Sequence, residues 1–316
     1  MSLQPRSVSN RLKALYIVVL VTGAILVQSS VNEALFTSVQ ARRTAPPPLS
    51  IMSLGTPVTQ NFDTLATAGT ANAWADDTTL PGWYSQFSLQ PTNPTAYRAE
   101  SGSGSTGAIY SYGTGANTDR AFGSVCSGTP GDIFIALKLT NNTGSTITAL
   151  DISYAGEQWR NGGNTSAQQL DFQYQVASPG AITDANTPVT GWTDFNALDF
   201  VSPITGATAA ALDGNAVSNR TTKSANLTVT VNNGQEIWLR WKDTNDTGND
   251  HGLAIDDLSV TALAPPDLTI NDVSAVDRVC RVGHATRQRQ YQRDRGGDIR
   301  IRQRSPQPDK HRSPPS

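Results

Sequence analysis

Short runs of alternating apolar and polar residues dominate the chain from about residue 57 to residue 263. The clearest runs are IFIALKL and TITALDISY, which are separated by the turn-forming cluster NNTGS. Runs of this kind end at Asn, Asp, Gly or Pro, as expected where a strand gives way to a turn. No window of about 15 residues in this region has the 3.6-residue apolar period of a helix. Roughly ten strands without intervening helices predict antiparallel sheets packed face to face.

We therefore expect residues 57–263 to form one all-β domain, an antiparallel β-sandwich of the jelly-roll type. The first strand, PVTQNFDTL, and the last, LAIDDLSVTA, are expected to lie side by side, because the chain ends of such domains often meet. In IWLRW, residues 237–241, large apolar side chains lie on both faces, which indicates a central strand. Arg240 shares a face with Trp238 and needs a buried partner. Glu157, in GEQWR, is the expected partner, and we interpret both residues as structural.

The N-terminal segment, residues 1–41, is typical of a secretory signal peptide. Basic residues precede the apolar run ALYIVVLVTGAILV, which is shorter than the roughly 20 residues of a membrane-spanning helix. A Pro-rich spacer, residues 42–56, follows this signal helix, and the mature domain is expected to begin near Ser50. The sequence thus predicts a secreted or cell-surface protein that contacts the membrane only through its signal peptide.

Charge is divided unevenly along the chain. Residues 50–264 carry eight basic and nineteen acidic residues, a net charge of −11, whereas residues 265–316 have a net charge of +5. The acidic central region argues against binding of nucleic acid through a broad basic face. Its single cysteine, Cys126, excludes an internal disulfide or a cysteine-rich zinc site there.

Hard oxygen ligands are frequent in KDTNDTGNDHG, residues 242–252. Carboxylate and amide oxygens at close spacing in a Gly-containing loop suit calcium, but a hairpin turn uses the same residue types. A second calcium candidate combines Asp63 on the first strand with Asp256 and Asp257 on the last, because one of these two must face the core. The candidate calcium ligands in the loop are Asp243, Asn245, Asp246 and Asp250.

Three aromatic residues are candidates for sugar binding. Trp83 and Tyr84, in LPGWY, and Trp192 lie next to turn residues and could form a stacking platform for a polysaccharide. Packing in the core or at its rim is the alternative for each of them.

The sequence argues against an enzyme. His251 is the single histidine of the acidic region, and the chain has no G-x-S-x-G elbow, P-loop or dinucleotide fingerprint. A glycosidase with two carboxylates is harder to exclude, because Asp is abundant. We interpret the region as a non-enzymatic binding or adhesion module whose partner is a polysaccharide or a cell-surface protein. The alternative is an accessory domain of a larger extracellular nuclease or hydrolase.

Several stretches resemble an N-terminal β-sandwich module of large bacterial secreted proteins. In those proteins, Calx-beta, cadherin-like, lamin-tail or nuclease-type domains follow the module. The resemblance covers about residues 57–263 and implies architecture and location, without a catalytic activity. The stretches that carry it are NFDTL, LPGWY, DRAFGS, GEQWR, LDGN and WLRWKDTNDTGNDHGLAIDDLSV.

The C-terminal region changes character abruptly. Residues 264–274 contain LTINDVS, which resembles the first strand of a Calx-beta repeat. Ten of residues 275–316 are arginine, and this tail shows no pattern of a strand or helix and is expected to be disordered. A one-base shift of the reading frame from Ala275 permits TESAGSGT, a typical Calx-beta start, so our hypothesis is that the tail is out of frame. A genuine basic tail that binds nucleic acid or an acidic surface is the alternative.

Overall fold

The computed structural model describes residues 49–264, together with Tyr291–Arg293 and Ile299–Ile301. Residues 49–264 lie in one unit of the chain, and the two short segments lie in a second unit. The residues for which the sequence predicts a signal peptide, a Calx-beta-like strand and the start of a frameshift all fall outside the described residues. Within the described part of the chain, no helix has the length and apolar character needed to cross a membrane.

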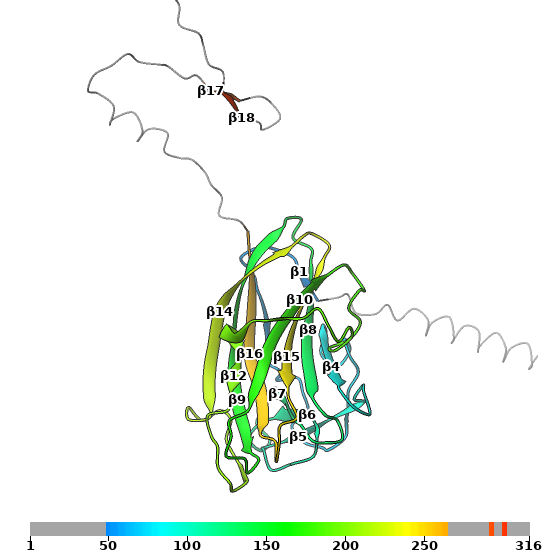
Figure 1. Cartoon of the computed structure of the whole chain (residues 1–316), viewed down its shortest axis with the longest axis vertical. Coiled ribbons are helices and arrows are strands. Elements are labelled where there is room, and N and C mark those ends of the chain that lie inside the picture. Colours follow the sequence, from blue (N-terminus) through cyan, green and yellow to red (C-terminus); the bar gives the residue numbers. More distant parts are fainter. Residues whose placement is uncertain (1–48, 265–290, 294–298, 302–316) are drawn as a thin grey trace, which may run out of the picture. The chain divides into compact units, whose positions relative to one another are not determined.

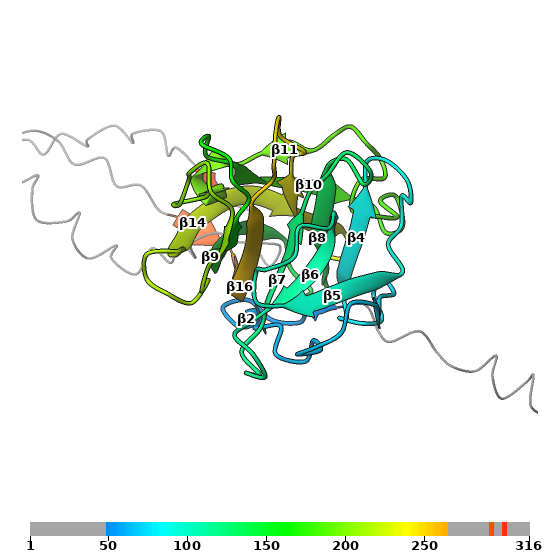
Figure 2. The same ribbon diagram turned by 90° about the horizontal axis from the view of Figure 1, so that it is seen from below.

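The first unit is an all-β sandwich, as the alternating pattern predicts, with one short 3-10 helix, Asn196–Leu198, among the described residues. Its strands form two sheets that make two layers (Figure 1). The seven-stranded sheet contains β1 (Ser50–Ile51), β4 (Trp83–Phe87), β8 (Ile133–Asn141), β10 (Gln169–Ala177), β11 (Thr193–Asp194), β12 (Phe200–Val201) and β15 (Glu236–Asp243). The nine-stranded sheet contains β2 (Pro57–Gln60), β3 (Asn72–Ala73), β5 (Ala96–Glu100), β6 (Ala108–Tyr112), β7 (Ala121–Val125), β9 (Ile147–Asn161), β13 (Ala210–Ala211), β14 (Arg220–Val231) and β16 (Gly252–Leu263). Figure 2 shows the layers from the end, with β16, β7 and β6 in one and β10, β8 and β4 in the other.

Most strand pairs are antiparallel, but two pairs run parallel. β1 adds to the edge of β8, and β5 pairs with β6, so both sheets are mixed rather than purely antiparallel. β1 lies within the segment that the sequence analysis assigns to the spacer, and Ile51 is buried in the core. The sheet therefore begins at Ser50, near the expected start of the mature domain and ahead of the first predicted strand at residue 57.

The predictions for the central strand and for the chain ends of the domain are confirmed. β15 lies between β8 and β10, and β2 pairs with β16. Ile237, Leu239 and Trp241 of β15 face the core between the two sheets. Trp238 is buried in a separate cluster that also contains Phe134, on the outer side of the seven-stranded sheet. Burial on both faces explains why this strand reads as apolar on both faces in the sequence.

A bulge in β16 changes the face of its two aspartates. Asp257 has a left-handed backbone, with φ of 49°, and the pairing of β16 with β9 shifts register between Asp256 and Ser259. Aspartate tolerates this conformation better than most residues with a side chain. Ile255 and Leu258 both face the core, whereas Asp256 lies on the opposite face with Ala254. The expectation that one aspartate of the pair faces the core is therefore wrong.

The second unit contains two short strands where the sequence analysis expects a disordered tail without strands. β17 (Tyr291–Arg293) pairs antiparallel with β18 (Ile299–Ile301). Aromatic and β-branched side chains favour strands, and Gly296 and Gly297 lie between the two segments in the sequence. The many arginines interrupt the apolar pattern, so these two strands were not predicted.

Candidate binding cavity

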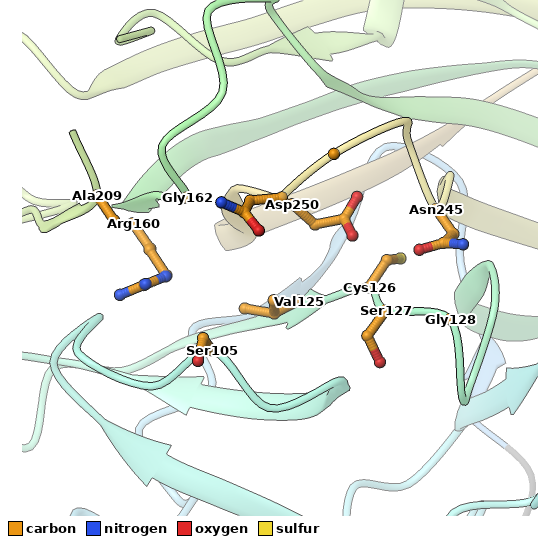
Figure 3. A pocket seen from close by; sticks show the side chains of 12 residues that line it. Ser105, Val125, Cys126, Ser127, Gly128, Arg160, Gly162, Ala209, Asn245 and Asp250 are labelled. Atoms are coloured by element: carbon orange, nitrogen blue, oxygen red, sulfur yellow. The ribbon is translucent and has the colours of Figure 1, made fainter. Parts of the chain in front are cut away.

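A cavity of about 370 Å³ opens beside the loop that joins β15 to β16 (Figure 3). The segment after β7 forms one wall, the end of β9 forms another, and the loop forms a third. The lining is mostly polar and contains no aromatic side chain. The lining residues are Ser105, Val125, Cys126, Ser127, Gly128, Arg160, Gly162, Ala209, Asn245, Gly248, Asn249 and Asp250.

The loop from residue 244 to residue 251 crosses from the seven-stranded to the nine-stranded sheet, so the hairpin interpretation is wrong. Side chains from the segment after β9 hold it in place. The Asn164 amide donates to the carbonyl oxygens of Thr247 and Asn249, both at 3.1 Å. The Gln168 amide donates to the carbonyl of Asn249 at 3.0 Å. Polar side chains from outside the loop therefore satisfy its backbone carbonyl groups at a crossing between the sheets.

Gly162 allows the loop to approach the end of β9. A Cβ atom on Gly162 would lie 2.1 Å from the carbonyl oxygen of Asp250. The backbone N–H of Gly162 donates to Nδ1 of His251 at 2.9 Å. His251 is fully buried, and burial lowers its pKa. Because Nδ1 accepts this hydrogen bond, it is not available as a base for a bound molecule.

The predicted calcium ligands of this loop point to different partners. Asp243 is buried at the end of β15, does not line the cavity and accepts a 2.6 Å hydrogen bond from the Ser124 hydroxyl. Burial raises the pKa of Asp243 to about 8. Asp250 accepts from the backbone N–H of Asp246 at 2.9 Å, and burial raises its pKa to about 6. Asn245 lines the cavity, and its backbone N–H donates to Asp132.

Arg160 contributes the guanidinium of the cavity wall. Its Nη1 donates to the carbonyl oxygens of Gly102, at 3.4 Å, and Ser103, at 3.0 Å. Its Nε is buried and has no hydrogen-bond partner. None of the ion pairs among the described residues involves Arg160. Figure 3 shows Arg160 on one side of the cavity and Asn245 on the other, with Asp250 between them.

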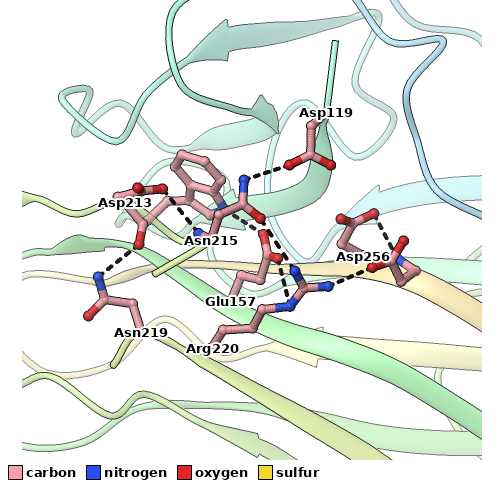
Figure 4. A network of polar contacts seen from close by, with 9 residues as sticks. Asp119, Glu157, Asp213, Asn215, Asn219, Arg220 and Asp256 are labelled. Atoms are coloured by element: carbon pink, nitrogen blue, oxygen red, sulfur yellow. Dashed lines mark hydrogen bonds and ion pairs between the residues drawn. The ribbon is translucent and has the colours of Figure 1, made fainter. Parts of the chain in front are cut away.

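The second calcium candidate lies in a separate polar network on the outer face of the nine-stranded sheet (Figure 4). Arg220 pairs across the strands with Glu157, and its Nε lies 3.4 Å from a Glu157 carboxylate oxygen. Its Nη2 lies 2.6 Å from Asp257. The Trp159 indole donates to the other Glu157 oxygen at 3.0 Å. Asp256, 1% exposed, accepts from the backbone N–H of Asp257 at 2.7 Å.

Two carboxyl groups of this network hold protons more tightly than free carboxyls do. Burial raises the pKa of Glu157 to about 7 and that of Asp256 to about 8, and the charge of Glu157 adds to the rise at Asp256. Asp63 is not among the charges that raise the pKa of Asp256. It accepts hydrogen bonds from Asn61 and from the backbone N–H of Arg120 instead.

No group of three or more His, Cys, Asp or Glu residues suited to a metal ion occurs in the described part of the chain. In the network of Figure 4, the Arg220 guanidinium already supplies positive charge between Glu157 and Asp257. Calcium binding stays a prediction.

The expected pairing of Arg240 with Glu157 is wrong, because the two residues lie on different sheets. Arg240 extends from the outer face of the seven-stranded sheet, and its guanidinium stacks 3.9 Å from the centroid of the Trp192 ring. The ring centroid of Phe134 lies 4.8 Å from Cζ of the same guanidinium. Neutral acceptors on Gln173 and Asn186 receive its hydrogen bonds. Burial lowers the pKa of Arg240 to about 9, and the charge of Asp194 offsets part of this effect.

The three candidate sugar-binding aromatics do not form one platform. Trp83 is 1% exposed, belongs to the core and stacks on Trp241, with ring centroids 5.8 Å apart. A ligand cannot reach it, so its assignment as a binding residue is wrong. Tyr84 and Trp192 are half-buried on the outer face of the seven-stranded sheet. Tyr84 packs on Trp238, with ring centroids 4.6 Å apart, whereas Trp192 stacks on the guanidinium of Arg240.

No protein-family model matches the chain, and no curated protein is similar to it. Among solved structures, a xylan-binding CBM22-1 domain of Paenibacillus barcinonensis Xyn10C matches at 10% identity and a TM-score of 0.33, covering 68% of this chain and 99% of that one. The K3 adhesin domain of Lys-gingipain from Porphyromonas gingivalis matches at 14% identity and a TM-score of 0.33, covering 61% and 99%. A Bacillus thuringiensis Cry1Da core variant matches at 9% identity and a TM-score of 0.32, covering 71% of this chain and 26% of that chain. At these sequence identities and TM-scores, the similarities say nothing about the ligand of this chain.

Sequence reasoning identified one wall of the cavity and missed the others. The loop residues Asn245 and Asp250 were found because oxygen ligands cluster there. Arg160 was not found, although it is one of eight basic residues in residues 50–264. Ser105 and Ser127 carry no signal in the sequence, because serine is common in turns. The scarcity of basic residues was the one clue that could have singled out Arg160.

Proposed function

We propose that residues 49–264 form a non-enzymatic binding module of a secreted or cell-surface protein, and that the cavity binds a hydroxyl-rich ligand such as a polysaccharide. The cavity carries this proposal. Its volume of about 370 Å³ falls in the range of small-molecule pockets. Donors and acceptors line it on several sides, as recognition of hydroxyl groups requires. The extracellular setting rests on the basic and apolar N-terminal sequence.

Two features of the domain support binding rather than catalysis. His251 uses Nδ1 to accept a backbone hydrogen bond, so its lone pair is occupied. Glu157 and Asp256, two carboxyl groups with raised pKa values in the separate network of Figure 4, are 0% and 1% exposed. A glycosidase needs its two carboxyl groups to contact the substrate, and these two are covered. The proposal assigns both groups to the packing of the sheet.

A blocked cavity tests the proposal. Ser105 is exposed and lines the cavity, so Ser105→Trp is expected to fill the opening and abolish binding in a screen of polysaccharides. Ser178 is exposed and lies outside the lining, so Ser178→Trp is the matched control and is expected to bind like the wild-type chain. Equal binding by both variants would show that the ligand lies elsewhere. Circular dichroism of the variants verifies that each retains the β-sheet.

A further inference from the structure

We propose that the cavity recognises an acidic sugar, a hexuronic acid unit of a polysaccharide, whose carboxylate pairs with Arg160. The inference rests on the proposed function of the same cavity and adds the charge of the ligand. Uronic acids combine one carboxylate with several hydroxyl groups on a single ring. The two sides of the cavity offer complementary partners for these two kinds of group.

The first observation is an incompletely bonded guanidinium. Arg160 is fixed by backbone carbonyls of Gly102 and Ser103 through Nη1, which leaves Nε buried and without an acceptor. No carboxylate among the described residues pairs with it. A guanidinium binds a carboxylate through two parallel N–H groups, and such charge-assisted bonds are about twice as strong as neutral ones. A carboxylate that enters the cavity can pair with the positive charge of the Arg160 guanidinium, whereas the buried Nε stays out of its reach.

The second observation is the chemistry of the other side of the cavity. Asp250 accepts one hydrogen bond from a backbone N–H, through Oδ1. Its other carboxylate oxygen, Oδ2, can accept further hydrogen bonds. It therefore attracts hydroxyl donors and repels a second carboxylate. Asn245 and Ser127 add neutral donors and acceptors to the lining. A ligand with one acid group and several hydroxyl groups matches this arrangement.

The third observation is the composition of the lining. None of the twelve lining residues is aromatic, so the cavity has no ring face for a sugar to stack on. The polar and charged groups must then provide most of the discrimination between ligands. A neutral sugar would leave Arg160 without a carboxylate, whereas an acidic sugar would pair with it.

The test compares uronic acid oligosaccharides with their methyl esters, which keep the sugar backbone and remove the charge. Binding of the full chain to galacturonate, glucuronate, mannuronate and guluronate oligomers is measured by calorimetry in a chelating buffer. At least one acid form is expected to bind about tenfold more tightly than its ester, which is the effect of one charge-assisted hydrogen bond. Equal binding of acid and ester would overturn the acidic-sugar inference and leave the proposed function intact. Absence of binding by every sugar, together with a negative polysaccharide screen, would overturn both.

A pair of variants at Ser105 keeps the test independent of folding defects at Arg160. Ser105→Glu places a carboxylate at the cavity wall and is expected to weaken binding of the acid at least about tenfold. Ser105→Gln has the same shape without the charge and controls for the added bulk, so it is expected to weaken binding of the acid less than Ser105→Glu does. Arg160→Gln is expected to remove the preference, and Arg98→Gln, outside the lining, is expected to preserve it. If both Ser105 variants lost the same affinity for the acid, the assignment of the carboxylate to Arg160 would be contradicted. The same holds if both arginine variants lost the preference for the acid over its ester.

Discussion

Replacing Asp243 by asparagine tests a buried carboxyl group at the end of β15. Asp243 is 3% exposed, and its carboxyl group accepts a hydrogen bond from the Ser124 hydroxyl at 2.6 Å. Burial therefore raises the pKa of its carboxyl group from 3.8 to about 8, and the charges of Asp250 and Asp246 add to the effect. Asparagine has nearly the same shape and stays neutral at every pH.

The raised pKa gives the effect a definite sign. In the unfolded chain this carboxyl loses its proton near pH 4, whereas in the folded domain it keeps the proton up to about pH 8. Between these values the native state binds more protons, so the free energy of unfolding falls as pH rises. Each pH unit costs about 1.4 kcal/mol for one proton, so the change from pH 4 to pH 7 is roughly 4 kcal/mol. Below pH 4 this destabilisation is absent, and above pH 8 it is complete.

Urea unfolding followed by tryptophan fluorescence measures this effect. All six tryptophans lie in residues 49–264, so the signal reports on the sandwich. Relative to the wild-type chain, Asp243→Asn is expected to gain roughly 4 kcal/mol between pH 4 and pH 7. Contributions from Glu157 and Asp256 cancel in this comparison, because both proteins contain them. Asp151→Asn, on the exposed part of β9, is the control. A difference that is constant with pH, or that falls as pH rises, would refute the reasoning.

Three further predictions concern stability. Trp83→Ala is expected to lower the free energy of unfolding by roughly 3–5 kcal/mol, because it empties a core position; a loss below about 1 kcal/mol in urea would contradict the burial. Trp192→Ala is expected to cost about 1–2 kcal/mol through the lost stacking on Arg240, whereas Trp192→Phe retains part of it; equal losses would argue against this contact. If calcium binds as the sequence predicts, a calcium concentration 100-fold above its dissociation constant stabilises the folded domain by about 2.7 kcal/mol. The melting temperature is then higher in calcium than in chelator, and identical melting temperatures would contradict calcium binding at either candidate site.

The strands could be predicted because their signals are local. Alternation of apolar and polar residues follows from the two-residue period of a strand, and the turns carry Asn, Gly and Pro. The central position of β15 was predicted from its apolar residues on both faces, and the structure confirms it between β8 and β10. The pairing of β2 with β16 was also predicted, because the ends of a sandwich domain often meet.

The partners of charged residues could not be predicted in this way. Glu157 and Arg240 were matched because each needed a partner and glutamate is scarce in the sequence. The structure places them on different sheets, where Arg220 pairs with Glu157 and Trp192 covers Arg240. The sequence shows that a buried charge needs partners. Which residues become those partners depends on which strands lie side by side in the fold. The bulge at Asp257 could not be predicted from the alternating pattern either. One extra residue in β16 moves the side chains that precede it to the opposite face of the sheet.

The sequence by itself determined the all-β class, the main strands, the uneven charge and the concentration of oxygen ligands between β15 and β16. These properties depend on residues within one strand or turn, so the period and composition of the chain record them. Only the tertiary structure decided that Trp83 belongs to the core, that the β15–β16 loop crosses between the sheets and that Arg160 lines a cavity with Asp250. Residues 105, 127, 160 and 250 come from four separate segments. Long-range packing of the two sheets brings them together, and no local pattern in the chain encodes that proximity.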